Sequence, residues 1–253
     1  MHALPQHRGG FHFESNYRTG VEDNHTQKAF IHAPGRETAV LNTYNNNRLR
    51  QFNSFLLEGV EHIWIGIDHV LFLITLLLVS VLVKKKSSLL PTKDLKSALW
   101  NVVAIVTVFT IAHSITLALA MKGWVDLPSR FVESVIALSI LIVVIDNIYS
   151  FLGRYKWSAV FIFGLFHGLG FASVLKDMTV DTQARILALL GFNLGVEVGQ
   201  LAIVIVVFPF LFLLRKRSYV NFILRPASAA IGFIALWWLV QRAFDLPSQW
   251  TSF

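Results

Sequence analysis

The sequence predicts an all-α, polytopic membrane helix bundle with six transmembrane helices, preceded by a short polar N-terminal external tail. The 253 residues are 55% hydrophobic and 15% charged, whereas a soluble domain is about 45–50% apolar and about 25% charged. The apolar residues fall in runs of about 20, the length that crosses a hydrocarbon core of about 30 Å. Residues 1–50 differ sharply, because they are polar and rich in Asn, His, Gly and Arg.

Residues 1–50 form the predicted external tail, and residues 51–253 form the predicted six-helix transmembrane domain. Two short apolar patches in the tail, KAFIHA and TAVLNTY, favour a mobile or strand-like segment. The tail contains no apolar segment typical of a cleavable signal peptide, so we expect the first helix to act as its own insertion signal. Five of the nine histidines lie in the tail, where scattered histidines are more often ordinary polar residues than metal ligands.

Six apolar runs predict the membrane spans. They cover residues 55–83, 99–121, 131–152, 158–175, 186–214 and 227–243. The first and the fifth are longer than a span requires, so we expect them to tilt or to protrude. Trp100, Trp124, Trp157 and Trp250 lie at or beyond the predicted helix ends, where indole rings favour the membrane interface.

The distribution of positive charge predicts the topology. The loops after the first, third and fifth helices hold eleven Lys and Arg residues, whereas the opposite loops and the C-terminal segment hold five. The positive-inside rule therefore places both termini outside. The net charge of +7 reflects this topology rather than a nucleic-acid-binding face, and no nucleic acid is expected as a partner. The absence of cysteine excludes disulfides, thiolate catalysis and Cys-type zinc sites.

The first predicted helix carries ionisable residues in an otherwise apolar run, GVEHIWIGIDHVLFLITLLLV. In a continuous helix His62 and His69, seven positions apart, lie within about 20° of each other and two turns apart on one face. Glu61 and Asp68 repeat this spacing on an adjacent strip. Gly66, between the histidines, is expected to let another helix approach closely.

All four histidines outside the tail lie in predicted spans, although polar side chains are costly there. This placement predicts a shared functional site, and we expect its groups to converge on a cavity that opens outward. A polar stripe on the fifth helix and an acid at the outer end of the third add to the group. The candidate metal residues are His62, Asp68, His69, His113, His167, Glu133, Asn193 and Glu197.

Two histidine segments resemble each other, FTIAHSITLA (109–118) and FGLFHGLGFA (163–172). Each has Phe followed four residues later by His, and the match is either chance or a sign of equivalent histidines. Ser114 can bond to the carbonyl one turn back, and Asp146 is interpreted as a capping or snorkelling group. The glycines beside these motifs are interpreted as helix-packing residues: Gly164, Gly168, Gly170, Gly195 and Gly199.

Neutral imidazoles and carboxylates are the ligand set for zinc, nickel, cobalt or iron, and the lack of thiolates argues against copper(I). A neighbouring carboxylate such as Glu61 or Asp68 can fix the tautomer of a ligating histidine. The alternative is a set of hydrogen bonds that bridge helices, worth about 0.6 kcal/mol each. Four histidines spread over several helices favour the shared site.

The segment HIWIGIDH (62–69) resembles the first-helix signature of the HupE/UreJ family of nickel permeases, and FGLFHG (163–168) is similar to its second histidine motif. The second HupE/UreJ-like subgroup is the closer match, over about residues 52–243. It is suggested by GVEHIWIGIDHVLFL, FTIAHSITLA, FGLFHGLGFAS and FNLGVEVGQ. The resemblance implies a six- or seven-helix protein of the bacterial inner membrane. It also implies metal-handling positions at His62, Asp68, His69 and His167.

The sequence departs from the family pattern at two positions. Ile63 stands where a proline usually follows the first histidine, and Gly170 stands where an acid is expected. Glu197 or Glu133 could substitute for that acid. Members of the subgroup often carry an external soluble domain before the helices, so residues 1–50 resemble a shortened remnant of it.

Three functions are open from the sequence. The first is a nickel or cobalt permease, in which metal enters at Glu133, Asn193 and His62, passes Asp68 and His69, and leaves toward the lysine-rich face; several sites of moderate affinity suit such movement. The absence of obvious broken helices argues against it.

The second function is an intramembrane zinc hydrolase that acts on a lipid or a membrane peptide. Its ligands would come from His69, His113 and His167, with Asp68 or Glu197 as the general base. The third is a membrane scaffold or assembly protein. The metal ion and the lipid bilayer are the expected partners, and a homo-oligomer or a membrane partner protein remains open.

Overall fold

The computed structural model describes residues 28–31, 39–42, 48–85, 88–170, 182–216 and 218–245. The chain divides into two units, Met1–Asn46 with Trp250–Phe253, and Asn47–Gln249. In the first unit β1 (Lys28–Ile31) pairs antiparallel with β2 (Ala39–Asn42). These strands lie in the two apolar patches that favour a strand.

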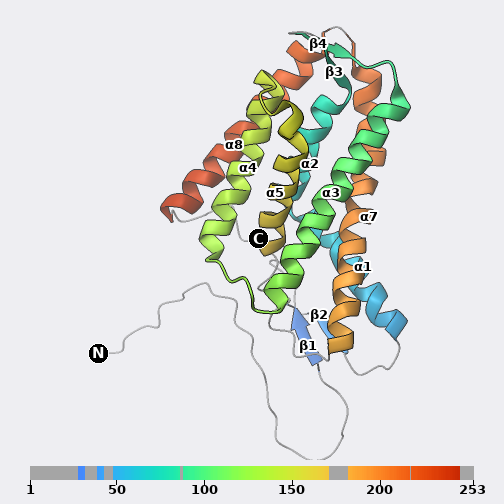
Figure 1. Ribbon diagram of the computed structural model, residues 1–253, viewed down its shortest axis with the longest axis vertical. Coiled ribbons are helices and arrows are strands. Elements are labelled where there is room, and N and C mark those ends of the chain that lie inside the picture. Colours follow the sequence, from blue (N-terminus) through green and yellow to red (C-terminus); the bar gives the residue numbers. More distant parts are fainter. Residues whose placement is uncertain are drawn as a thin grey trace, which may run out of the picture. The chain divides into compact units, whose positions relative to one another are not determined.

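The second unit is a bundle of helices (Figure 1). Its α-helices are α1 (Arg48–Ile65), α2 (Ile67–Ser80), α3 (Leu95–Met121), α4 (Ser129–Tyr149), α5 (Lys156–Gly170), α7 (Thr182–Leu214) and α8 (Arg225–Phe244). A 3₁₀ turn (Gly153–Tyr155) precedes α5, and a π-helix (Val220–Leu224) leads into α8. An antiparallel hairpin of β3 (Leu82–Lys85) and β4 (Ser88–Pro91) lies at one end, which we call the hairpin end.

Four described segments are long and apolar enough to cross a membrane: Leu95–Met121, Ser129–Tyr149, Ala184–Leu214 and Val220–Phe244. The bent pair α1 and α2 makes a fifth if it counts as one span. The described part of α5 has 15 residues, or about 22 Å at 1.5 Å per residue, and is shorter than a span. The predicted span 158–175 therefore ends in residues outside those described, and the prediction of six spans is supported only in part.

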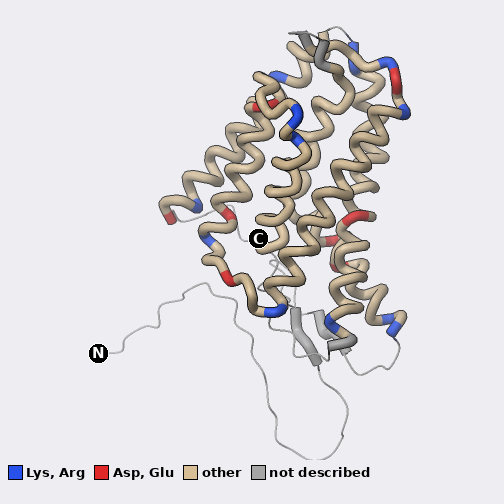
Figure 2. The backbone as a smooth tube through the Cα atoms, in the orientation of Figure 1, with Lys and Arg blue, Asp and Glu red and all other residues tan. Residues whose placement is uncertain are grey.

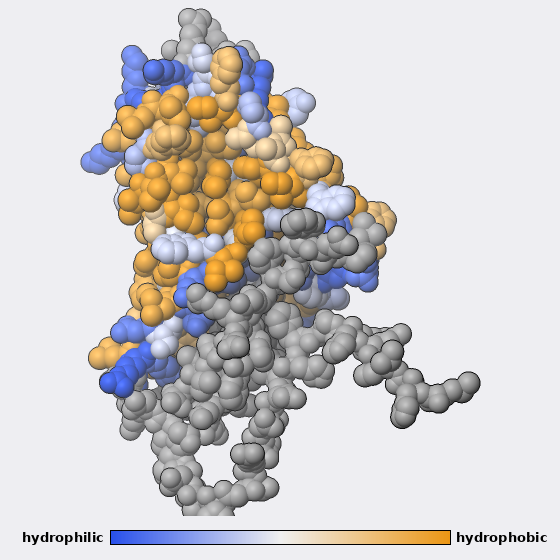
Figure 3. Space-filling model, turned by 180° about the vertical axis from the view of Figure 1, so that it is seen from behind, coloured by the Kyte–Doolittle hydropathy of each residue, from blue (hydrophilic) through white to orange (hydrophobic). Residues whose placement is uncertain are grey.

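The surface of the bundle suits a lipid environment. Figure 3 shows hydrophobic side chains over most of the visible part of the helices, with hydrophilic residues at the upper end. Large apolar side chains are widely exposed, including Phe222 at 78% and Phe233 at 73%. Figure 2 shows Lys and Arg near the helix ends, with several of them at the hairpin end.

The first predicted helix is not continuous, which corrects the expectation of one helix from residue 55 to 83. Gly66 adopts an extended conformation (φ −67°, ψ 91°) and separates α1 from α2, which are bent by 71°. Its N–H donates to the His62 carbonyl at 2.9 Å, and its own carbonyl accepts from the Val70 N–H at 3.1 Å. Glycine favours such a break because it has no Cβ and is a weak helix former.

Helix α2 also ends earlier than predicted, at Ser80, where the chain turns into β3. Side chains from elsewhere bind its last turns: Tyr219 donates its hydroxyl to the Leu78 carbonyl at 2.8 Å, and Asn147 donates from Nδ2 to the Thr75 carbonyl at 2.8 Å. The Leu78 carbonyl is one that a helix end leaves without an intrahelical partner. The hairpin end of α2 is thus fixed to α4 and to the π-helix.

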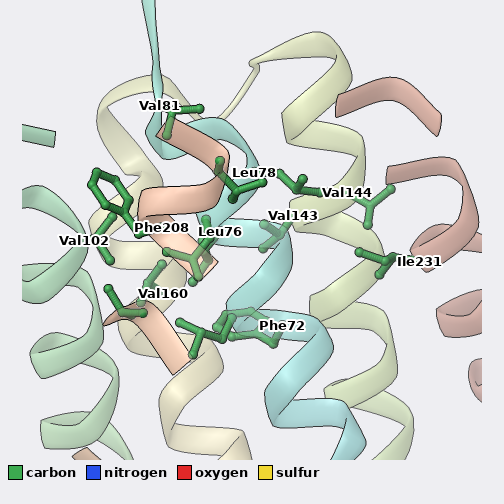
Figure 4. Packing of buried hydrophobic residues seen from close by; sticks show 14 of the residues in the cluster. Phe72, Leu76, Leu78, Val81, Val102, Val143, Val144, Val160, Phe208 and Ile231 are labelled. Carbon is green, nitrogen blue, oxygen red and sulfur yellow. The ribbon is translucent and has the colours of Figure 1, made fainter. Parts of the chain in front are cut away.

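The helices pack in pairs, α1 on α7, α3 on α5 and α4 on α8, and α2 lies against α4, α7 and α3. Small residues permit the close approaches: a Cβ on Gly59 would collide with the Phe192 carbonyl, and one on Gly195 with the Leu56 carbonyl. The half of the bundle toward the hairpin end is filled by a continuous apolar cluster. Figure 4 shows this cluster from Phe72 past Leu76 to Val81.

Candidate functional site

The four histidines outside the tail come from four helices and meet in one cluster. His62 closes the last turn of α1, His69 lies in the first turn of α2, His113 is in α3 and His167 is in α5. The ring centroids are 4.7 Å apart for His62 and His69, and 5.1 Å apart for His69 and His167. His113 lies 6.1 Å from both His62 and His69. The break at Gly66 brings the first two rings together although their helices diverge.

Glycines hold the helices close at the level of the cluster. A Cβ on Gly168 would collide with the His113 carbonyl and the Thr116 hydroxyl, and one on Gly164 would lie 2.7 Å from the Phe109 carbonyl. These contacts press α5 onto α3 and bring His167 and His113 into the same region. The interpretation of Gly164 and Gly168 as packing residues is confirmed.

Gly66 has a different role from the one predicted. Its nearest side-chain neighbours belong to its own segment, since a Cβ there would lie 2.7 Å from the His62 carbonyl and 2.9 Å from His69 Nδ1. The three atoms nearest to such a Cβ all belong to residues 62–69 rather than to another helix. It shapes the turn that carries the first two histidines.

Hydrogen bonds orient two of the rings in the same way. His69 Nδ1 lies 3.2 Å from Asp68 Oδ1, and His167 Nδ1 lies 2.9 Å from the Phe163 carbonyl oxygen. Because an oxygen acceptor holds the proton on Nδ1 of a neutral imidazole, the Nε2 lone pair is left available in both rings. This is the tautomer that a metal-binding histidine adopts when an acceptor holds its other nitrogen.

Several ring nitrogens of the cluster are buried without a hydrogen-bond partner among the described residues. His113 and His167 are fully buried and His69 is 4% exposed. Nε2 of His69, Nε2 of His167 and both nitrogens of His113 find no hydrogen-bond partner among the residues that the structure describes. Buried polar atoms are normally paired, so unpaired nitrogens of this kind call for an explanation. As they stand, no three or more His, Asp or Glu side chains in the described chain are arranged to hold a metal ion.

Comparison with known proteins identifies the family of the chain. A family model described as HupE / UreJ protein matches residues 37–242. The chain belongs to the HupE/UreJ family. This family is associated with nickel and cobalt transport and consists of membrane proteins. No curated protein and no solved structure matches this HupE/UreJ chain.

The other predicted residues of this HupE/UreJ protein lie in different contacts. Glu197 accepts a hydrogen bond from Thr107 Oγ1 at 2.8 Å, and Asn193 donates from Nδ2 to the Leu189 carbonyl of its own helix at 2.8 Å. Glu133 binds Ser129 Oγ at 2.9 Å and Arg242 Nε at 3.1 Å. None of these described contacts joins Glu133, Asn193 or Glu197 to a histidine.

Two minor expectations are confirmed in the HupE/UreJ chain. Ser114 Oγ donates to the Thr110 carbonyl one turn back at 2.7 Å. Asp146 acts as a cap, because its Oδ1 accepts from the Leu152 N–H at 2.7 Å after the end of α4. Glu61 is exposed, whereas Asp68 is the carboxylate that orients a histidine.

Sequence reasoning missed the phenylalanines that surround the HupE/UreJ histidines. Phe109 and Phe72 each have ring centroids 5.1 Å from His167, and Phe192 lies 5.3 Å from His62. A signal for Phe109 was present, since it precedes His113 by four residues. That spacing places the two side chains on neighbouring turns of one helix face, and the ring centroids are 6.2 Å apart.

Proposed function

We propose that this protein is a nickel or cobalt permease whose intramembrane site is built on His62, His69, His113 and His167, with Asp68 as the orienting carboxylate. The observation that carries the proposal is the cluster of four imidazoles from four helices with unpaired, buried ring nitrogens on His69, His113 and His167. Burying such groups is costly unless a ligand uses them. Neutral imidazole is a favoured ligand of nickel, and the family is associated with its transport.

The broken helix supports transport rather than packing. Secondary transporters commonly place their binding sites at discontinuous helices near the middle of the membrane. Here α1 and α2 meet at 71°, and the nearest histidine on each side of the break, His62 or His69, is in the cluster. Irregular backbone within a membrane is tolerated where it lines a cavity or lies inside protein.

Ring separations also support a shared ion. Two imidazoles bound to one divalent ion at about 2.1 Å, with angles of about 90–120° between them, have centroids roughly 4.6–5.7 Å apart. The separations of 4.7 Å and 5.1 Å around His69 fall within this interval, and the 6.1 Å separation of His113 lies just outside it. Binding therefore requires a small rotation of the rings so that the nitrogens converge. A site that is not closed in advance suits the moderate affinity that movement through a membrane needs.

Metal analysis of the purified chain tests the proposal directly. The tail histidines are first replaced by alanine so that they cannot contribute metal. They are His2, His7, His12, His25 and His32. In this background we expect exchangeable nickel or cobalt binding, and its loss in His69→Ala. Tight stoichiometric zinc would favour the hydrolase instead, and no metal binding together with loss of folding in His69→Ala would favour the scaffold.

Uptake into vesicles separates binding from transport. The tail-substituted protein in proteoliposomes should accumulate nickel, and His167→Ala should abolish accumulation while the protein remains monodisperse. Equal uptake by both proteins, or by protein-free vesicles, would rule out transport through this site.

A further inference from the structure

The half of the bundle toward the hairpin end begins with a layer of three phenylalanine rings beside the histidines. Phe72 comes from α2, Phe109 from α3 and Phe163 from α5. The Phe72 ring lies 5.3 Å from Phe109 and 6.1 Å from Phe163, with the two planes at 90° in the second pair. These three residues, which we call the phenylalanine layer, are at most 9% exposed.

The layer lies on one side of the cluster. Helix α2 runs toward the hairpin end, and Phe72 is three residues beyond His69. Helices α3 and α5 run away from that end, and Phe109 and Phe163 each precede their histidine by four residues. All three rings are therefore about one turn, or roughly 5–6 Å, closer to the hairpin end than the imidazoles. Phe72 and Phe109 each touch the His167 ring at 5.1 Å.

Buried apolar side chains also fill the bundle on the hairpin side of the phenylalanine layer. Leu76, Val106 and Val160 are the next inward residues on the same three helices, and each is at most 6% exposed. They belong to the apolar cluster that extends to Val81 at the hairpin end (Figure 4). Thr75, in the same region, is bound to the Leu71 carbonyl at 2.7 Å. A hydrated ion cannot cross packed apolar side chains of this kind.

We propose that Phe72, Phe109 and Phe163 form the closed gate of the pathway on the hairpin side of the histidine cluster. This inference rests on the proposed function as a permease, because a gate has meaning only if something passes. Hydrophobic constrictions gate by excluding water, and water enters when the rings separate. The structure is the state in which the cluster is shut off from the hairpin end.

The fixed position of α2 indicates which part of the gate moves. Tyr219 and Asn147 bind the Leu78 and Thr75 carbonyls, one to two turns from Phe72. The pair α3 and α5, held together by Gly164 and Gly168, carries the other two rings. We expect opening to separate the rings of Phe109 and Phe163 from the ring of Phe72.

Polar side chains also lie between α3 and α7, where water could enter instead of passing the phenylalanine layer. Thr110 and Thr107 of α3 donate to Gln200 at 3.0 Å and to Glu197 at 2.8 Å on α7. These bonds bridge α3 and α7 rather than α3 and α5. The test below distinguishes the routes by the position at which water appears.

Thiol labelling tests the gate without any metal. The chain has no cysteine, so a single introduced thiol is the only target of the reagent. Val160→Cys places one thiol a turn past Phe163 on the hairpin side, in the full-length protein in proteoliposomes. A charged, water-soluble thiol reagent should label it slowly, and Phe72→Ala should raise the rate on the order of tenfold or more, since water then reaches the thiol. Phe72→Leu, which restores an apolar side chain, should return most of the protection.

The matched control is Phe208→Ala, which removes an equally buried ring from the same apolar cluster. Its ring contact is with Phe212 at 6.0 Å. It should leave labelling of Val160→Cys within about twofold if the layer is specific. Fast labelling without any gate substitution, or the same acceleration by Phe208→Ala, would overturn the gate, and labelling of a Gln200→Cys thiol alone would assign the route to α3 and α7.

Nickel flux in the same vesicles separates this inference from the proposed function. If Phe72→Ala raises labelling but no variant moves nickel, the gate exists and the permease assignment is wrong. If nickel moves and labelling of Val160→Cys is unaffected by Phe72→Ala, the permease stands and the gate is elsewhere. Size-exclusion profiles of each variant exclude misfolding as the cause.

Discussion

At the scale of single residues, neighbouring oxygen atoms determine which ring nitrogen of His69 and of His167 is available. Asp68 and the Phe163 carbonyl take the Nδ1 positions of His69 and His167, so both rings present Nε2. His113 has no such partner in the described chain for either nitrogen. Two rings are therefore oriented by hydrogen bonds, whereas His113 is held by packing, because its ring lies 6.2 Å from Phe109 and 6.4 Å from Phe192.

Replacement of Asp68 by asparagine should weaken nickel binding roughly 10–100-fold, the usual cost of losing a group that orients a metal-binding histidine. The amide can present either oxygen or nitrogen to His69 Nδ1, so it no longer fixes the tautomer. Titration of purified protein with nickel measures the change. Asp94→Asn is the control, because Asp94 caps α3 by accepting from the Ser97 N–H at 3.1 Å, and its affinity should equal that of the unchanged protein.

At the scale of elements, the break between α1 and α2 is what assembles the site. A straight helix would place His62 and His69 two turns apart, or about 10 Å along the axis. The break at Gly66 reduces this to 4.7 Å between ring centroids. Backbone geometry, rather than side-chain choice alone, therefore creates the closest pair in the cluster.

Gly66→Ala should reduce nickel affinity at least about tenfold, because the new methyl group meets the His62 carbonyl at 2.7 Å and His69 Nδ1 at 2.9 Å. Alanine also favours a continuous helix across the break. Gly170→Ala is the matched control, since its only described neighbour is the Ile136 Cδ1 at 3.2 Å, a side-chain end that can shift. Unchanged binding by Gly66→Ala would mean that the break does not shape the site.

Tyr219→Phe tests the fixed end of α2. The buried Leu78 carbonyl would lose its hydroxyl donor, and an unsatisfied buried polar group costs about 1–3 kcal/mol. Thermal unfolding in detergent should show a lower midpoint than for the unchanged protein. Tyr149→Phe, at a residue that is 74% exposed, should leave the midpoint in place.

The sequence predicted the elements better than their joints. Apolar runs located four or five of the six predicted spans because the membrane imposes their length, and the cost of polar groups in lipid predicted that the four histidines meet. The break at Gly66 was missed because membrane helices often contain glycine without breaking. The ends of α2 and the partners of Glu133 depend on residues far away in the chain, such as Tyr219 and Arg242. Contacts between residues so far apart leave no local pattern in the sequence from which they could be predicted.

At the scale of the whole molecule, the histidine cluster and the apolar cluster occupy different levels along the bundle. The histidine cluster and the break lie between an apolar half toward the hairpin end and the end where α1 and α7 begin. Several Lys and Arg residues lie at the hairpin end (Figure 2). By the positive-inside rule we expect the hairpin end to face the cytoplasm, and the gate proposed above would then lie on the cytoplasmic side.

Single cysteines in the cysteine-free chain test this orientation. Ser97 and Ser129 are exposed residues in the first turns of α3 and α4, at opposite ends of the bundle. In intact bacterial spheroplasts an impermeant maleimide should label Ser129→Cys at once and Ser97→Cys only after permeabilisation, because the lysine-rich loops stay on the cytoplasmic side. The reverse labelling pattern would show that the protein has the opposite orientation in the membrane. The phenylalanine layer would then close the outer side of the histidine cluster, and an ion would reach the site first from the cytoplasm.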